Sequence, residues 1–421
     1  MTGLILAASF LLHAGKLIDV DGGRILTDQG VLIEGESIAA VGPYADIARK
    51  AAPSAVRIDL TSVAVLPGLA DCHTHTVSRS DGKDPHGYLL QLATRSLADR
   101  ALEGAANARA ILRAGFTTVR DVESEGAGTA DASLRDAIAR KLVEGPRMLV
   151  ATRGIAAVGG YLPHGVSRDL AARFPTGAQL VSGADEARRA AREQLAAGAD
   201  LIKAYADFPD ETVPGVKPML AVDELRAIAE EAHRRGRKLA VHATSSAGIA
   251  NALEAGADSI EHGWDATPAQ LATMASHKTT LVPTTWALMT RLAAAPPQAK
   301  ALVERRLGEL RSLIANARAA KVNLAAGSDV AEAGDHGNNA RELASLVELG
   351  LSPIEALRAA TTACHAAIGE DGGRLVQGGR ADVIAVEGDP LADVGALRRV
   401  KFVMKAGAVA KDAIHPHADA D

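Results

Sequence analysis

Segments with the apolar spacing of amphipathic helices alternate with short segments rich in β-branched residues between residues 101 and 326. Four of the helical segments end beside a glycine, which commonly marks the C-terminus of a helix. The expected helices cover residues 101–114, 184–197, 222–235, 247–255, 268–276 and 299–319. The strands expected to follow them cover residues 116–120, 200–205, 238–243, 259–262, 280–284 and 322–326.

Two further apolar segments, residues 63–65 and 148–151, raise the number of expected strands in this region to eight. Eight strands with helices between them are typical of a closed (β/α)8 barrel and less so of an open doubly wound sheet. No GxGxxG sequence follows the first strand, which further weakens a dinucleotide-binding sheet as the alternative. The pattern therefore predicts an α/β protein built on a TIM barrel.

Both ends of the chain have a different pattern. Residues 10–62 and 370–410 contain short alternating segments separated by glycine-rich turns, which predict antiparallel strands. Because these segments flank the barrel on both sides, we expect them to pair as a small β-sandwich built from both termini. The predicted division is residues 1–62 and 370–421 for the sandwich and tail, and residues 63–369 for the catalytic barrel.

The sequence LILAASFLL at residues 4–12 is the most apolar stretch near the N-terminus. It has about half of the ~20 residues that a membrane-spanning helix needs, and no basic residues precede it. A first β-strand is the preferred interpretation, and the remnant of a trimmed leader is the alternative. The expected location is accordingly soluble and cytoplasmic, or periplasmic or secreted if a leader has been removed.

The composition excludes several classes of protein. The chain has 421 residues, 48% hydrophobic, with 46 Lys and Arg against 51 Asp and Glu, so no basic surface for nucleic acid is expected. Its two cysteines, Cys72 and Cys364, cannot form a disulfide framework, and no paired Cys–His spacing predicts structural zinc. Aromatic residues make up only 3% of the chain, so we expect a core of Ala, Val, Leu and Ile.

The sequence VLPGLADCHTHT carries the clearest chemical signal. His73 and His75 alternate along a strand, so both rings project to the same side, toward the barrel face where active sites lie. Alone, the two histidines could equally be ordinary surface or core residues. Four further metal-ligand types fall at the ends of other expected strands. The six candidate ligands are His73, His75, Lys203, His242, His262 and Asp329.

These ligand types suit Zn²⁺, Mn²⁺ or Co²⁺ with an open position for water. Lys203 is unusual, because an unpaired ammonium inside an apolar strand is costly to bury and needs a partner or a chemical modification.

The combination of these motifs with the GSD sequence at residues 327–329 resembles the metal-dependent amidohydrolase superfamily. The segment GGRLVQGGRADVIAVEGDPL is similar to the one that closes the β-sandwich of that family, and the resemblance covers residues 10–410. It implies two divalent metals, with zinc the first choice, and a Lys203 that is carboxylated by CO2 and bridges them. It implies that His73, His75 and Asp329 hold the more buried metal, and that His242 and His262 hold the more exposed one.

Two metals of this kind activate a bridging water and polarise a carbonyl. Asp329 would then carry the proton from the attacking hydroxide to the leaving amine. A cap or turn role for Asp329 is the alternative when that residue is considered alone.

Other residues are candidates for binding the substrate. His164, in the loop after the third strand, is placed to bond the substrate carbonyl or a terminal carboxylate, although it could be an ordinary solvated histidine. Tyr205 should face the same way as Lys203, and Arg153 could pair with a carboxylate; packing and a structural salt bridge are the respective alternatives. Trp286 is expected to form an apolar wall. His336 is interpreted as a surface residue, and Cys72 should point away from the metals.

The branch of the superfamily is predicted from the residues beside the ligands. A glutamate three residues after the strand-five histidine is typical of the deaminases, whereas His242 is followed by Ala243, Thr244 and Ser245. Cyclic-ureide hydrolases share the lysine. A cyclic amide or ureide hydrolase similar to imidazolonepropionase remains an alternative, as does a metal-dependent deaminase. The sequences IKAYAD, AVHATS and SIEHG are closer to the prolidase-like branch, which cleaves dipeptides and N-acyl amino acids.

Within that branch the chain resembles bacterial amidohydrolases that split ochratoxin A into ochratoxin α and L-phenylalanine. The resemblance also implies a homo-oligomer, with an octamer as the form known in the family, and no nucleic-acid or membrane partner. A non-catalytic barrel would be expected to lack a metal ligand, and none of the six is missing.

Overall fold

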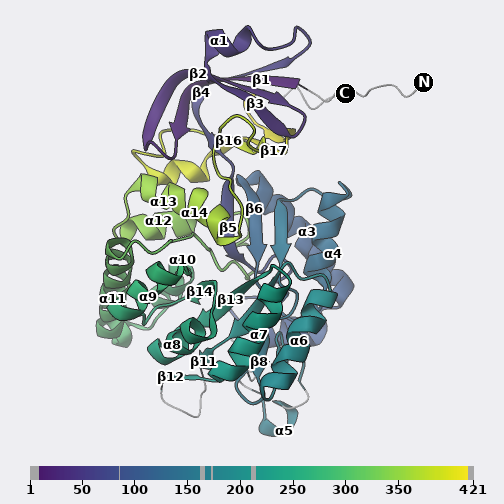
Figure 1. The fold of residues 1–421 in the computed structure, drawn as a ribbon, viewed down its shortest axis with the longest axis vertical. Helices are drawn as coiled ribbons and strands as arrows, with labels where there is room; N and C mark the ends of the chain where they lie inside the picture. Colours follow the sequence, from purple (N-terminus) through teal and green to yellow (C-terminus); the bar gives the residue numbers. More distant parts are fainter. Residues whose placement is uncertain (1–8, 85, 162–165, 172–173, 210–214, 416–421) are drawn as a thin grey trace, which may run out of the picture.

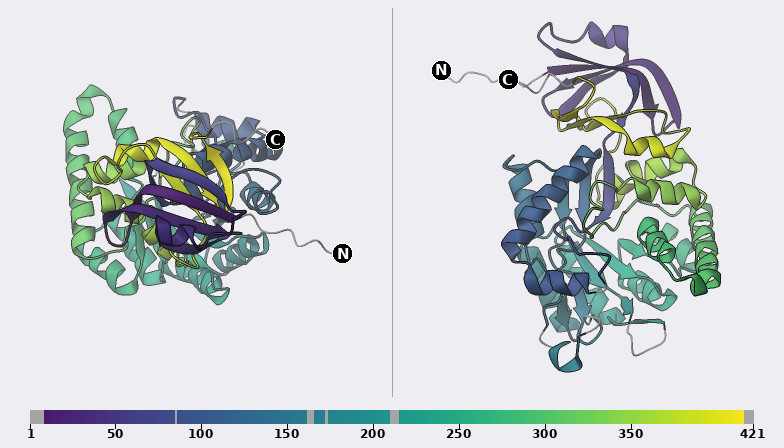
Figure 2. Two further views of the ribbon diagram at one scale, coloured as in Figure 1. Left: turned by 90° about the horizontal axis from the view of Figure 1, so that it is seen from above. Right: turned by 180° about the vertical axis from the view of Figure 1, so that it is seen from behind.

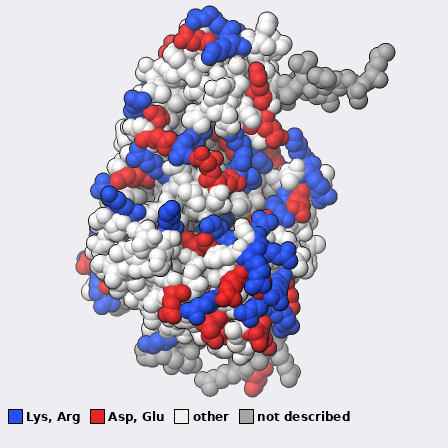
Figure 3. Space-filling view, viewed as in Figure 1, with Lys and Arg blue, Asp and Glu red and all other residues white. Residues whose placement is uncertain are grey.

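The computed structural model describes residues 9–84, 86–161, 166–171, 174–209 and 215–415, and it has an α/β fold. Figure 1 shows one β-sheet at one end of the molecule and a larger body of parallel strands and helices below it. No helix in the described residues combines the length and the apolar character needed to cross a membrane. Charged side chains of both signs are mixed over the face drawn in Figure 3.

Strands from the two ends of the chain form one seven-stranded sheet, in the order β18-β17-β16-β4-β1-β2-β3. The N-terminal and C-terminal parts meet where β4 runs antiparallel to β16, with Leu66 opposite Ile384. Figure 2 shows the strands from the two ends side by side. The strands are β1 (Ser9–Asp19), β2 (Arg24–Glu34), β3 (Ser37–Pro43), β4 (Val56–Pro67), β16 (Val383–Val386), β17 (Val400–Lys405) and β18 (Ala408–Asp412).

Apolar side chains from distant strands of this sheet share one core. Leu12 and Ile33, from the N-terminal strands, belong to the same buried cluster as Val383, Phe402 and Met404 from the C-terminal ones. Both ends of the chain therefore contribute strands to one sheet and side chains to one core, and the predicted pairing of the two ends is confirmed. Whether its strands divide into the two layers of a sandwich stays a prediction, as do the domain boundaries.

The body contains two parallel sheets, of order β5-β6-β7 and β15-β14-β13-β10-β8-β9. Asp200 N donates to Val150 O over 2.7 Å, which links one sheet to the other. On the opposite side, Leu281 forms a parallel bridge with Leu324, and Cys72 N donates to Ala326 O. The strands are β5 (Leu69–Thr74), β6 (Phe116–Asp121), β7 (Arg147–Val150), β8 (Ile155–Ala157), β9 (Gln179–Val181), β10 (Leu201–Tyr205), β13 (Lys238–Ala243), β14 (Ser259–His262) and β15 (Thr280–Val282).

The six predicted helices are confirmed to within a few residues, as α3 (Leu97–Arg113), α6 (Ala184–Ala196), α7 (Val222–Arg234), α8 (Ser246–Ala255), α9 (Pro268–His277) and α11 (Lys300–Ala319). Their ends follow local chemistry. The Ser245 hydroxyl caps the N-terminus of α8, and Gly256 ends that helix in the left-handed conformation. The other elements are α1 (Tyr44–Ala48), α2 (Gly87–Thr94), α4 (Ala130–Ala139), α5 (Arg168–Ala171), α10 (Thr285–Ala293), α12 (Arg341–Glu348), α13 (Pro353–Ala359), α14 (Thr362–Ala367), β11 (Asp207–Pro209), β12 (Val216–Pro218), η1 (Pro297–Ala299) and η2 (Val394–Arg398).

Two strand predictions are wrong in detail. Residues 63–65 do not form the first parallel strand, because β4 continues through them and pairs with β1 and β16 in the terminal sheet. The first parallel strand of the body is β5, which begins directly after Gly68. Residues 322–326 are not a continuous strand and contribute only the bridge at Leu324 and single backbone hydrogen bonds.

The two cysteines form a disulfide that the sequence did not predict. Cys72 in β5 is bonded to Cys364 in α14, 292 positions away, and both are buried. Cys72 packs in an apolar cluster with Val282 and Ala325, so its side chain points away from the candidate ligands, as expected.

Candidate active site

A cavity of about 490 Å³ opens where the parallel strands end at their carboxyl termini. We call it the strand-end cavity. Carboxyl ends of parallel strands are where α/β barrels place their active sites. Six of its lining residues are the candidate ligands predicted from the sequence: His73, His75, Lys203, His242, His262 and Asp329.

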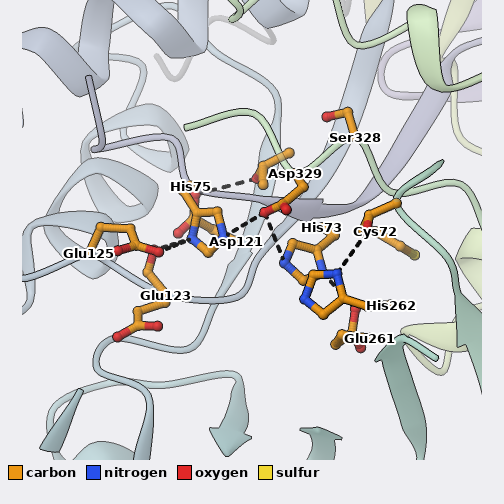
Figure 4. Close-up of polar contacts among 12 residues, drawn as sticks. Cys72, His73, His75, Asp121, Glu123, Glu125, Glu261, His262, Ser328 and Asp329 are labelled. Atoms are coloured by element: carbon orange, nitrogen blue, oxygen red, sulfur yellow. Dashed lines mark hydrogen bonds and ion pairs between the residues drawn. The ribbon is translucent and has the colours of Figure 1, made fainter. Parts of the chain in front are cut away.

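Three of these ligands form a compact group. Donor atoms of His73, His262 and Asp329 all lie within 4.8 Å of one another, which is close enough to hold one metal ion. Asp329 Oδ1 also lies 3.1 Å from His75 Nε2, and the rings of His242 and His262 are 4.4 Å apart between centroids. Figure 4 shows His73, His75 and His262 gathered around Asp329. The closest group thus draws members from both of the predicted metal sites.

Neighbouring polar groups fix which nitrogen of each ring faces the cavity. His73 Nδ1 is 2.8 Å from Glu261 Oε2, and His262 Nδ1 is 2.7 Å from Thr284 Oγ1. His75 Nδ1 is 3.1 Å from the Glu123 carbonyl oxygen. With Nδ1 occupied, each ring presents Nε2, which is the usual arrangement of a histidine ligand and its supporting hydrogen bond.

His242 has a buried atom that lacks a partner. Its Nε2 makes no hydrogen bond among the described residues, and the nearest carboxylate oxygen, on Asp207, is 3.8 Å away. An unsatisfied buried nitrogen is costly unless something outside the chain binds it. A divalent metal ion would do so, and the chemistry of the six donors therefore fits a metal centre.

Burial sets the protonation of most ligands. It lowers the pKa of His73 to about 4, and it lowers the pKa of His242 and His262 well below the ordinary value. These rings are therefore neutral, which metal ligation requires. Burial also lowers the pKa of Lys203, whose side chain is 1% exposed. A lowered pKa increases the fraction of neutral amine, the form that reacts with CO2.

His75 and Asp329 form a charged pair instead. Burial opposes protonation of His75, but Glu125 and Asp329 raise its pKa to about 10. Burial would raise the pKa of Asp329, yet the neighbouring His73 ring and the hydrogen bond from His75 hold it well below the usual range. Asp329 is therefore a carboxylate, the form that accepts a proton.

Strained backbone occurs at three positions of the site. His262, Thr284 and Asp329 have φ values of 72°, 45° and 57°, in the left-handed region that non-glycine residues rarely adopt. Such residues cluster at functional sites because the surrounding fold must hold them there. The strain turns His262 and Asp329 into the cavity at the point where each strand or loop ends.

The predicted substrate-binding residues have different outcomes. Tyr205 and Trp286 line the strand-end cavity, whereas Arg153 does not and instead donates to the carbonyl oxygens of Gly177 and Ala178. His164 lies outside the described residues. The prediction that His336 is a surface residue is wrong. Its side chain is buried, and Nε2 lies 3.3 Å from the His75 carbonyl oxygen.

Sequence reasoning missed the supporting residues of the site. Glu261 stands beside His262 in the sequence and accepts two hydrogen bonds from Arg120, at 2.7 and 2.8 Å. Those contacts outweigh burial and lower the pKa of Glu261 to about 2. Glu123 accepts a hydrogen bond from the Tyr205 hydroxyl and is fully buried. Charged residues within or directly after apolar strands, such as Arg120, Glu123 and Glu261, were the available signal, but nothing in the sequence showed which of them interact with the ligands.

Aromatic residues are concentrated in the cavity. Six of the eleven Phe, Tyr and Trp residues in the chain line it, including both tryptophans. The low aromatic content suggested only an aliphatic core and did not predict this concentration. The six residues are Tyr88, Tyr161, Tyr205, Phe208, Trp264 and Trp286.

Comparisons with known proteins agree with this site. Residues 64–410 match the model of the Amidohydrolase family. The chain is 30% identical to ochratoxinase of Aspergillus niger, over 93% of this chain and 84% of that protein. The crystal structure of A. niger ochratoxinase is similar to this structure with a TM-score of 0.84, and the match covers 96% of each chain at 26% identity.

Two further solved structures are similar. One is a prolidase complexed with N-methylphosphonate-L-proline, with a TM-score of 0.82, 30% identity, and coverage of 96% of this chain and 100% of that one. The other is a Xaa-Pro dipeptidase with bound methionine in its active site, with a TM-score of 0.81, 28% identity, and coverage of 96% and 99%.

Proposed function

This chain belongs to the amidohydrolase family, in its prolidase-like branch, and is a hydrolase of amide or peptide bonds, and we propose that it uses two bound metal ions to remove the C-terminal amino acid of its substrate. Its substrates are N-acyl amino acids and dipeptides with a free C-terminal carboxylate, and ochratoxin A is one of them. The products from ochratoxin A are ochratoxin α and L-phenylalanine.

One observation carries the proposal: all six candidate ligands line a single cavity, and His242 Nε2 within it has no hydrogen-bond partner among the described residues. Two divalent ions, with Zn²⁺ the first choice, would use these donors fully. Carboxylation of Lys203 would turn a buried amine into an anionic oxygen ligand. This would remove the free-energy cost of burying an unpaired ammonium group at Lys203.

The metals supply an activated water and a polarised carbonyl when bound. Asp329 is ionised, and its carboxylate accepts the proton that the attacking water loses. The same carboxyl group then donates that proton to the amide nitrogen, so the bond between the carbonyl carbon and the nitrogen breaks and a neutral amine leaves. Glu261 and Thr284 hold the His73 and His262 rings in the required orientation throughout.

The lining of the cavity supports an aromatic or apolar substrate. Tyr161, Tyr205 and Phe208 form one group of rings with centroids 4.7 to 5.9 Å apart. Trp264 and Trp286 also line the cavity. Ligand sites are mostly apolar with a few placed polar groups. Ochratoxin A, which has an aromatic ring on each side of its amide, suits such a lining.

The fold and assembly of the proposed enzyme follow the same family pattern. We propose that the two parallel sheets close into a (β/α)8 barrel, which the links at Val150, Leu324 and Ala326 support. A two-layered terminal sandwich, the domain boundaries at residues 62 and 369, and a homo-octamer belong to the same proposal. Small-angle scattering and mass measurement in solution would test the assembly.

The test of the function is a hydrolysis screen at one metal loading. We expect release of the amino acid from N-acyl-L-phenylalanine, ochratoxin A and Xaa-Pro dipeptides. The competing function is hydrolysis of a cyclic amide or ureide. Imidazolonepropionase of Chloroflexus aggregans, which is 29% identical over 56% of this chain, brings this class into consideration. A preference for a cyclic ureide over all the acyclic amides would overturn the proposal in favour of that class.

A further inference from the structure

Cations inside the strand-end cavity are few. Among the described residues that line it, Lys203, Arg291 and Arg306 are the lysine and arginine side chains. Lys203 is buried among the candidate ligands. Arg306 is already neutralised, because Nη1 donates to Asp265 over 2.8 Å and to Glu309 over 2.7 Å. The guanidinium of Arg291 makes no hydrogen bond or ion pair within the described part of the chain.

Arg291, on α10, lines the cavity and is exposed. Ala287 and Leu288 precede it by four and three positions on that helix and line the cavity too. Residues three or four apart lie on one face of a helix, so Arg291 shares the cavity-facing side of α10. Trp286, also on α10, provides part of the apolar wall.

Two acidic residues of the strand-end cavity would oppose binding of a substrate carboxylate, and an unpaired cation would offset their charge. Glu332 and Asp335 line the same cavity, and the two carboxyl groups would repel a substrate carboxylate. Burial and the charge of Asp335 raise the pKa of Glu332, whereas the charge of Arg291 opposes that rise. The Arg291 charge therefore reaches Glu332, and no ion pair among the described residues neutralises it.

We propose that Arg291 binds the free carboxylate of the substrate's amino-acid half and so determines the preference for amides with a free C-terminus. This inference rests on the proposed function. The carboxylate carbon of such a substrate is two bonds from the scissile nitrogen, so its partner must lie in the same cavity. A guanidinium fork binds a carboxylate through two parallel hydrogen bonds, which a single ammonium cannot do.

This assignment replaces two of the candidates from the sequence, Arg153 and Tyr205. Arg153 is bound to backbone carbonyl groups outside the cavity, and the Tyr205 hydroxyl is bonded to Glu123. A basic residue in the last turn of a helix is also favoured by the helix dipole. Stability alone would therefore not reveal the role of Arg291, and the test must measure discrimination between substrates.

The experiment compares benzoate release from N-benzoyl-L-phenylalanine and from its C-terminal amide, with metal content measured for each protein. We expect Arg291→Met to lower kcat/KM for the acid by about 10- to 150-fold, the range of a hydrogen bond to a charged group, and to leave the amide unchanged. Arg291→Lys should restore part of the loss. Arg305→Met, on α11 and outside the described lining of the cavity, is the matched control and should change neither rate.

An unchanged preference for the acid in Arg291→Met would overturn the inference and leave the proposed function standing. So would an equal loss with both substrates. A wild-type enzyme that releases benzoate from neither compound would contradict the proposed function itself, and the inference with it.

Discussion

Glu261 Oε2 lies 2.8 Å from His73 Nδ1, in a contact that is completely buried between β14 and β5. Arg120 Nη2 binds both oxygens of the same carboxylate. Because Nδ1 is occupied, His73 turns Nε2 toward Asp329, 3.4 Å away. Strand β14 therefore provides the candidate ligand His262 and also Glu261, which orients the ligand His73 on β5.

Glu261→Gln should weaken metal binding by about 10- to 100-fold, because the amide no longer supplies the charged acceptor that orients His73. Competition with a coloured chelator would measure the affinity. Glu254→Gln, which changes a glutamate at the end of α8 that is 66% exposed, is the control and should bind metal like the wild type. Equal affinity in the two variants would show that His73 does not need its buried partner.

Lys203→Ala should abolish activity and reduce the metal content, because it removes the proposed bridging ligand. Short carboxylic acids should restore part of the activity by occupying the space of the lost side chain. Lys203→Arg should stay inactive, since a permanent cation cannot ligate a metal. Full activity in Lys203→Arg would rule out the bridging role.

The disulfide between Cys72 and Cys364 should stabilise the folded chain by about 2–4 kcal/mol. Urea unfolding with and without a thiol reductant would measure this difference. The double variant Cys72→Ser and Cys364→Ser should be insensitive to the reductant. Two reactive thiols in unfolded wild-type protein that has seen no reductant would contradict the bond.

Glu342 should make stability depend on pH. Burial raises its pKa to about 8, while its carboxyl group holds the N-terminus of α10 through the backbone N–H groups of Thr285 and Trp286. The folded state therefore holds this proton more tightly than the unfolded state. The resulting stability is complete below the unfolded pKa and is lost as the pH rises through the folded value.

Between the unfolded and the folded pKa of Glu342, the free energy of unfolding should fall by about 1.4 kcal/mol per pH unit. Glu342→Gln cannot ionise, so the free energy of unfolding of the wild type should fall relative to that of the variant as the pH rises. Urea unfolding of both proteins across this interval would measure the difference. A constant difference between the two proteins would refute the raised pKa.

Much of the fold could be predicted because its signals are local. The spacing of apolar residues and the glycines at 198 and 256 placed α6 and α8 to within one residue of their observed ends. The assignment of residues 63–65 failed because a strand of the terminal sheet and a strand of the body look alike when both are apolar. Only the partner strands distinguish them, and those lie more than 300 residues away in the case of β16.

The candidate ligands could be predicted because all but Asp329 lie in or directly after a parallel strand, and the carboxyl ends of such strands converge in this type of fold. Their partners could not, since the contacts of His73 with Glu261 and of Tyr205 with Glu123 join residues with no shared local pattern. The same holds for Arg291 and Arg153. Nothing in the sequence shows which of these two arginines faces the site, and only the structure shows that Arg291 lines the cavity and Arg153 does not.

The central claim is that one site with two metal ions hydrolyses the amide of an N-acyl amino acid. Its most direct test is the release of L-phenylalanine from ochratoxin A by metal-depleted protein as Zn²⁺ is added back. The account predicts that the rate reaches its maximum near two ions per chain and that Asp329→Asn stays inactive at the same loading. A rate that saturates near one ion per chain, or no release of L-phenylalanine at any loading, would contradict it.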